Sequence, residues 1–271
     1  MKEALDKART ALAYYQSAGN GEQVQHYETL LSVYEGRKVP GFYRTDGFEA
    51  YFAHTFSALL TLLLLLFILA GLIPAERESG MDSLILTAKK GERNMSGDKL
   101  AACAVVAVML VTWFTAVDLV TLAVTNGLYD WSNPLYSLAT YAASPVGWSI
   151  GAQVAFLFLL KVLGAVAVAA LIALCSRLAP GTVSAFSAGG ILLAGLIVAD
   201  DLCRVNVVDS WYVLLNPVSA FTFSGRLTAF ETVTVGSLCL QRWIVHAVLI
   251  SLAALLACGA ALIALKRRRA A

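Results

Sequence analysis

Apolar residues are concentrated in five long stretches of the chain that carry almost no charge. They cover residues 53–73, 100–125, 157–178, 182–200 and 243–265. A helix needs about 20 apolar residues to cross the hydrocarbon core of a bilayer. Backbone polar groups inside lipid must be satisfied within the segment, and these runs lack the alternation typical of barrel strands. The pattern therefore predicts an all-α polytopic helical bundle over residues 52–271, with five transmembrane helices.

Residues 1–51 follow a different pattern, in which apolar side chains recur at helical spacing on otherwise polar segments. Residues 2–17 and 22–35 each present one apolar face, and the Ser17–Gly21 cluster separates them. We expect an αα-hairpin that packs outside the membrane. An alternative is that its tyrosines bind a ligand.

The composition agrees with a membrane protein. Of the 271 residues, 59% are hydrophobic and 14% are charged, whereas soluble domains average about 45–50% and about 25%. These values exclude a disordered chain, a basic nucleic-acid-binding domain and an ordinary cytosolic enzyme. The net charge of +2 indicates nothing about partners, because basic and acidic side chains nearly cancel.

The distribution of Lys and Arg predicts the orientation of the chain. Ten of them lie in segment 74–99, in the turn 177–181 and in the tail 266–269, against three in residues 126–145 and 200–242 together. Basic residues in short loops favour the cytoplasmic side. We therefore expect the C-terminus and segment 75–99 in the cytoplasm, and the chain as a multi-pass protein of a cell inner (cytoplasmic) membrane.

This orientation puts residues 1–51 outside, although they carry six basic residues and no signal peptide. A charged tail of this length is not easily exported without a preceding span. The pattern favours a truncated six-span protein that lacks its first helix. The alternative is a true five-span protein with an exported tail.

Two ionisable residues fall in or beside the apolar stretches, where charges are costly and mark functional candidates. Asp118 either lines a translocation path, pairs with another helix, or is hydrated near the interface. If the third span starts at Trp148, Lys161 falls near the midplane. We favour the alternative, an interfacial helix over 146–160 followed by a span over 162–178, in which the Lys161 ammonium reaches the outer surface. We find no metal-ligand cluster, since His26, His54 and His246 lie on separate segments.

The remaining features concern packing outside and between the spans. Small residues in spans three and four predict that these two helices pack closely together. We expect outer interfacial segments over 130–156 and 201–242. Residues 210–235 of the second are expected to form short helices, with aromatic residues at headgroup level. Cys203 and Cys239 both fall outside; a disulfide between them is one option, and free thiols are the favoured one.

Segment 75–99 carries the most specific pattern. It has five acidic and five basic residues, with an apolar group around Met81 and Leu84. A short amphipathic helix here would suit docking into the groove of a partner. The alternative is a solvated connector on the membrane surface.

The run Glu76-x3-Gly80-Met81-x2-Leu84-x2-Thr87-x3-Gly91-x-Arg93, with Lys99 just before the next span, resembles the loop after the second span of ABC transporter permeases of the ABC-2 exporter type. The resemblance extends to the order of spans over residues 50–265 and to the N-terminal hairpin. In that family the loop forms the coupling helix that touches the ATP-binding subunit. The resemblance therefore implies partner coupling through Glu76, Gly80, Met81, Leu84 and Arg93.

The resemblance further implies a bacterial export permease that works as a homo- or heterodimer in the lipid membrane. The chain has no P-loop, so we expect no catalytic residues and no cofactor in it, with ATP bound and hydrolysed in the partner subunit and no nucleic acid involved. The alternatives are an ion-coupled secondary transporter and a non-transport membrane sensor or scaffold. The substrate is not readable from the sequence.

Overall fold

The computed structural model describes residues 2–35, 37, 46–81, 91–206, 215–235 and 238–267. Within these residues, five helical stretches are long and apolar enough to cross a membrane: Asp46–Glu78, Gly97–Thr125, Ile150–Leu178, Thr182–Leu202 and Arg242–Ala264. The all-α polytopic bundle is therefore confirmed. The chain divides into two compact units, which are described separately below.

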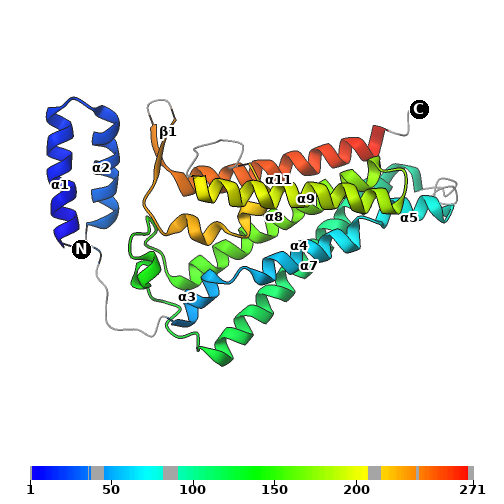
Figure 1. Cartoon of the computed structure of the whole chain (residues 1–271), viewed down its shortest axis with the longest axis horizontal. Helices are drawn as coiled ribbons and strands as arrows, with labels where there is room; N and C mark the ends of the chain where they lie inside the picture. The colour runs from blue at the N-terminus through cyan, green and yellow to red at the C-terminus, as the bar shows by residue number, and fades with distance from the viewer. Residues whose placement is uncertain are drawn as a thin grey trace. The chain divides into compact units, whose positions relative to one another are not determined.

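Unit 1 comprises Met1–Ala53, Thr121–Phe156 and Phe223–His246. It begins with the predicted hairpin, formed by α1 (Lys2–Ser17) and α2 (Gly21–Tyr34), which lie side by side in Figure 1. The Asn20 side chain caps α2 by accepting a hydrogen bond from Gln23 N. The unit also contains α3 (Asp46–Ala53) and two 3₁₀ turns, η1 (Leu135–Ser137) and η2 (Ala139–Tyr141).

Unit 1 ends with a second 3₁₀ region and a β-hairpin. After η4 (Phe223–Leu227), strand β1 (Thr232–Val235) pairs antiparallel with β2 (Leu238–Gln241). The prediction of short interfacial helices over 210–235 is wrong for β1, because the run Thr-Val-Thr-Val is β-branched throughout and fits a pleated strand.

Unit 2 comprises His54–Val120, Leu157–Thr222 and Ala247–Ala271. Its core lies where α4 (Phe56–Leu69), α7 (Gly91–Thr125) and α8 (Ile150–Leu178) meet. Leu65, Ala107 and Ala165 are completely buried there. The unit also contains α5 (Leu72–Glu78), α9 (Thr182–Asn206), η3 (Pro217–Ala220) and most of α11 (Arg242–Arg267) (Figure 1).

The outward faces of the long helices are apolar. Val124 at the end of α7 and Val183 at the start of α9 are 81% and 82% exposed, and Leu255 on α11 is also exposed. Large exposed apolar surfaces on helices are typical of contact with a membrane or another protein. Together with the length of the helices, it agrees with a membrane-embedded protein.

The third span begins earlier than expected. Helix α8 runs unbroken from Ile150 to Leu178, so the separate interfacial helix over 146–160 is wrong. Lys161 follows eleven residues after the helix start, which at about 1.5 Å per residue is about 16 Å into it. Lys161 therefore lies in the middle part of a long helix and not at the end of a short one.

The small residues of spans three and four face other partners than we expected. Ala167 and Ala170 of α8 pack with Ala254, Ala257 and Ala261 of α11. A Cβ added at Gly189 of α9 would lie 2.8 Å from Leu66 Cδ1 of α4 but 3.9 Å from Ile172 of α8. The small side chains thus mainly allow α8 to approach α11 and α9 to approach α4.

Candidate functional site

Two places in unit 2 bring together the residues that the sequence marked. One is the set of contacts made by α5, where segment 75–99 begins, and the other is the polar group around Asp118.

Helix α5 carries the first residue of the coupling pattern. Glu76 forms an ion pair with Lys99 of α7, the last residue of the same pattern. Both side chains are largely buried, with 27% and 17% exposure. Because the two residues lie 23 positions apart, their pairing brings the two ends of the intervening segment together.

Neighbouring residues attach α5 to the turn between α8 and α9. The Arg77 guanidinium donates to the backbone carbonyls of Arg177 at 3.1 Å and Ala179 at 3.3 Å. The Glu78 carboxylate accepts from Thr182 N at 2.8 Å and from Thr182 Oγ1 at 2.9 Å. Thr182 is the first residue of α9, so this carboxylate lies where a helix N-terminus favours negative charge.

A buried serine completes the attachment. Ser176 Oγ of α8 donates to the carbonyl of Ala70 at 2.8 Å and accepts from Ile73 N at 3.4 Å. This satisfies backbone groups at the α4–α5 junction that have no helical partner. As a result, α5 is bonded to α7, α8 and α9, and a displacement of α5 would act on all three helices.

The other coupling residues are only partly within the described chain. Gly80 ends α5 with a φ of +69°, a backbone conformation that glycine adopts without steric cost. Met81 follows it and is exposed. Leu84 lies outside the described residues, and Arg93 is placed by its backbone in the first turn of α7.

The second place is a polar group around Asp118. Ser57 Oγ of α4 donates to Asp118 Oδ2 at 2.5 Å, and His54 Nε2 lies 3.8 Å from Asp118 Oδ1. The Asp118 side chain is only 12% exposed. The Lys161 ammonium on α8 acts electrostatically on the same carboxylate. Of the three sequence alternatives for Asp118, the structure supports pairing with other helices.

Asp200 is a buried acidic side chain that the sequence did not mark, because it lies at the end of the fourth apolar stretch. Asp200 of α9 is 1% exposed and accepts a hydrogen bond from Thr222 Oγ1 at 2.9 Å. Asn216 Nδ2 donates to the Leu196 carbonyl nearby, at 2.7 Å. No pattern along the chain separates Asp200 from the neighbouring Asp201, which is exposed.

Some aromatic residues of the two expected interfacial segments are buried within unit 1. Phe223 is fully buried, and its ring contacts Phe156 and His246. Tyr141 is also buried, and this burial raises the pKa of its hydroxyl to about 12. These buried side chains pack the turns of unit 1 against one another.

Two further expectations concern metal and sulfur chemistry. Among the described residues there is no group of three His, Cys, Asp or Glu side chains arranged to hold a metal ion. Cys239 is a free thiol, which agrees with the favoured alternative to a Cys203–Cys239 disulfide.

Comparisons with known proteins add no relative to this picture. No protein family model, no curated protein and no solved structure matches the chain.

Proposed function

We propose that this chain is the membrane-embedded permease subunit of an ATP-driven exporter of the ABC-2 type, acting as a dimer in a bacterial cytoplasmic membrane. In this proposal a separate ATP-binding subunit docks on α5 and segment 75–99. ATP is bound and hydrolysed in that subunit, and the substrate crosses between the helices of the permease.

The observation that carries the proposal is the Glu76–Lys99 ion pair, supported by the bonds of α5 to α8 and α9. A docking segment can transmit force only if its ends are attached to the parts that must move. Here the first and last residues of the coupling pattern are joined to each other, and the adjoining residues are bonded to two more spans. A partner that shifts α5 would therefore bias the bundle between two arrangements.

The test is complex formation with an ATPase. The full chain is co-expressed with a Walker-motif ATPase encoded beside its gene, and the complex is purified through the ATPase. We expect co-purification, and its loss when Gly80 and Leu84 are both replaced by Asp. Ser132→Asp is the matched control and should leave the complex intact. Ser132 is exposed and lies on the side expected to be extracytoplasmic.

The proposal is overturned if no such ATPase is encoded nearby, or if the Gly80/Leu84 variant and the Ser132 variant retain the complex equally. To separate a docking defect from misfolding, each variant is also tested for a single symmetrical peak in size-exclusion chromatography.

A second candidate, an ion-coupled secondary transporter, is favoured by the polar group around Asp118. A carboxylate with a serine, a histidine and a lysine near it inside a helical bundle is a typical position for an ion or proton relay. Under this alternative, transport by the purified chain in vesicles would follow an ion gradient without ATP, and Asp118→Asn would abolish it.

A further inference from the structure

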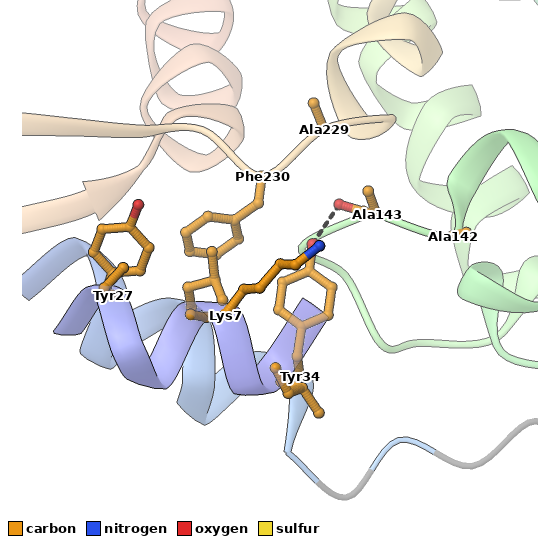
Figure 2. Close-up of a pocket in the computed structure, with 11 residues that line it drawn as sticks. Lys7, Tyr27, Tyr34, Ala142, Ala143, Ala229 and Phe230 are labelled. Atoms are coloured by element: carbon orange, nitrogen blue, oxygen red, sulfur yellow. Dashed lines mark hydrogen bonds between the residues drawn. The ribbon is translucent and has the colours of Figure 1, made fainter. Parts of the chain in front are cut away.

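Unit 1 contains a cavity of about 760 Å³. It lies between the N-terminal hairpin and two loops that are distant from it in the sequence, at residues 142–143 and 229–230. Figure 2 shows side chains from α1 and α2 on one side and the backbone near Ala143 and Phe230 on the other. The walls are mostly apolar, and the lining side chains that could meet a ligand are Leu5, Ala8, Ala11, Tyr27, Leu30 and Phe230.

Helix α2 is held in place at both ends of this wall. Near its start, a hydrogen bond of 2.7 Å joins His26 Nδ1 and Thr232 Oγ1. At its end, the Tyr34 hydroxyl donates to the Ala143 carbonyl (Figure 2). The Phe230 ring lies between these anchors, with its centre 5.4 Å from that of His26 and 5.9 Å from that of Tyr34. The cavity is therefore preformed, which is typical of small-molecule sites.

Two basic side chains lie at the Tyr34 end of the cavity: Lys7 is in its lining, and Arg37 lies against the Tyr34 ring. The Arg37 guanidinium stacks on the Tyr34 ring at 4.2 Å and on the Tyr136 ring at 4.8 Å. In the described part of the chain, its two terminal nitrogens are buried and have no hydrogen-bond partner. Lys7 extends toward the same end (Figure 2). The acid nearest to Arg37 in the sequence, Glu35, is paired with Arg9 at 2.8 Å.

We propose that this cavity binds a single-chain amphipathic anion, with its acyl chain against Tyr27, Leu30 and Phe230 and its anionic head at the end formed by Lys7 and Tyr34. The volume lies within the range of about 300–1,000 Å³ found for ligand pockets. An apolar wall with positive charge at one end matches a molecule that has an apolar body and one negative end. The inference does not depend on ATP-driven transport.

Photo-crosslinking tests the proposal, because it separates binding in the hairpin from partition into lipid. The full chain is placed in phosphatidylcholine nanodiscs and irradiated with hexadecanoate that carries a diazirine at its tail, and the adducts are mapped by mass spectrometry. We expect saturable adducts within residues 22–35, displaced by excess hexadecanoate. A monoacyl phosphate serves as a second competitor and shows whether a carboxylate or a phosphate head is preferred.

Two matched variants locate the site. Ala11→Trp fills the cavity from α1, whereas Ala13→Trp places the same side chain on an exposed position of the same helix. We expect the first to reduce the hairpin adducts by about tenfold, since most apolar contact with the chain is lost, and the second to leave them unchanged. Lys7 is exposed, so Lys7→Gln does not disturb the core. This variant should weaken competition by hexadecanoate but not by hexadecanol.

The proposal is wrong if the adducts occur only in the spans, if they do not saturate, or if Ala11→Trp and Ala13→Trp behave alike. Equal competition by hexadecanol and hexadecanoate in the unmodified chain would overturn the anionic class of the ligand. Since none of these readouts involves an ATPase, failure here is distinct from failure of the proposed transport function.

Discussion

At the scale of single residues, the position of Asp118 depends on a neighbour that no sequence pattern marks. Its carboxylate accepts a hydrogen bond from Ser57 Oγ. His54 Nε2 lies 3.8 Å from the same carboxylate, and the Lys161 ammonium acts on it electrostatically. A carboxylate that is withdrawn from water requires such partners, because an unpaired charge in a low-dielectric interior is costly.

Removing the serine hydroxyl should therefore destabilise the bundle. Hydrogen bonds to charged groups contribute more than neutral ones, so we expect Ser57→Ala to lower the free energy of unfolding by about 1–3 kcal/mol. Thermal unfolding of the purified chain in detergent measures this. Ser187→Ala is the control, because Ser187 is exposed and donates to the Val183 carbonyl of its own helix. Equal midpoints for the two variants would contradict a stabilising role for the Ser57–Asp118 bond.

His26 should make the attachment of the N-terminal hairpin sensitive to pH. Burial lowers the pKa of its imidazole below the ordinary value of 6.5. The unfolded or detached state therefore takes up a proton more readily, so stability is fully present above about pH 6.5 and is lost as the pH falls through the lowered pKa. Hydrogen exchange should show weaker protection of α2 at pH 5.5 than at pH 7.5.

The same measurement on two variants assigns the effect. His26→Gln retains a group that can bond to Thr232 but does not titrate, so its protection should no longer change with pH. His54→Gln removes an exposed histidine elsewhere and should leave the pH response of α2 intact. A pH response that persists in His26→Gln would assign the effect to another group.

These residues also show what the sequence could reveal at this scale. Asp118 was identifiable because an acid inside an apolar stretch is rare. Ser57 and His54 were not, since serine and histidine near the start of a span are unremarkable, and their contact with Asp118 depends on how α4 and α7 are rotated against each other. Asp200 was missed for the same reason, because burial separates it from Asp201 and the chain order does not.

At the scale of elements, close helix contacts depend on individual glycines. A Cβ at Gly164 of α8 would lie 2.6 Å from the Pro217 carbonyl oxygen and 2.7 Å from Ala220 Cβ in η3. Both contacts are too short for real atoms, and neither partner is a flexible side chain. We expect Gly164→Ala to lower the free energy of unfolding by about 1–3 kcal/mol through overpacking.

Gly195 of α9 provides the matched control for this substitution, because a Cβ there would meet nothing within 4 Å. Gly195→Ala should be neutral or stabilise by up to about 1 kcal/mol, since alanine favours helix more than glycine does. Thermal unfolding of both variants in the same detergent gives the comparison. A loss for Gly195→Ala as large as that for Gly164→Ala would show that the helix positions, and not the contact with η3, cause the effect.

The Glu76–Lys99 pair should contribute measurably because both side chains are largely buried. A double-mutant cycle with Glu76→Gln, Lys99→Gln and both together is expected to give a coupling energy of about 1 kcal/mol. The Asp6–Arg9 pair serves as the control: its side chains are 72% and 57% exposed and 3.7 Å apart, so its coupling should lie near zero. Additive effects at Glu76 and Lys99 would show that the pair does not hold α5 to α7.

Element boundaries illustrate where sequence patterns were sufficient. The spans followed from long apolar stretches with almost no charge, and α1 and α2 followed from apolar periodicity, which helix geometry imposes directly. The β-hairpin is hard to predict because aromatic residues dominate the pattern of residues 201–242, although Thr232–Val235 and Leu238–Gln241 flank a Gly-Ser pair that suits a turn. The partners of the small residues in α8 and α9 could not be predicted, since small residues permit close approach without specifying to which helix.

At the scale of the whole molecule, the topology is the property on which the other expectations depend. Met81 and Ser132 are both exposed, and α7 is the one apolar helix between them in the sequence of the described residues. If α7 crosses the membrane, these two positions must lie on opposite sides. If basic residues orient the chain, Met81 lies in the cytoplasm and Ser132 outside.

Single cysteines at these two positions, in a chain whose five native cysteines are replaced, test both statements with one reagent. We expect a membrane-impermeant maleimide to label Ser132→Cys in intact cells, because its thiol faces the medium, and to label Met81→Cys only after the membrane is opened. Labelling of both in intact cells would show that α7 does not span. The reversed pattern would invert the bundle, which would place α5 and its contacts with α7, α8 and α9 beyond the reach of any cytoplasmic ATPase and so remove the proposed coupling.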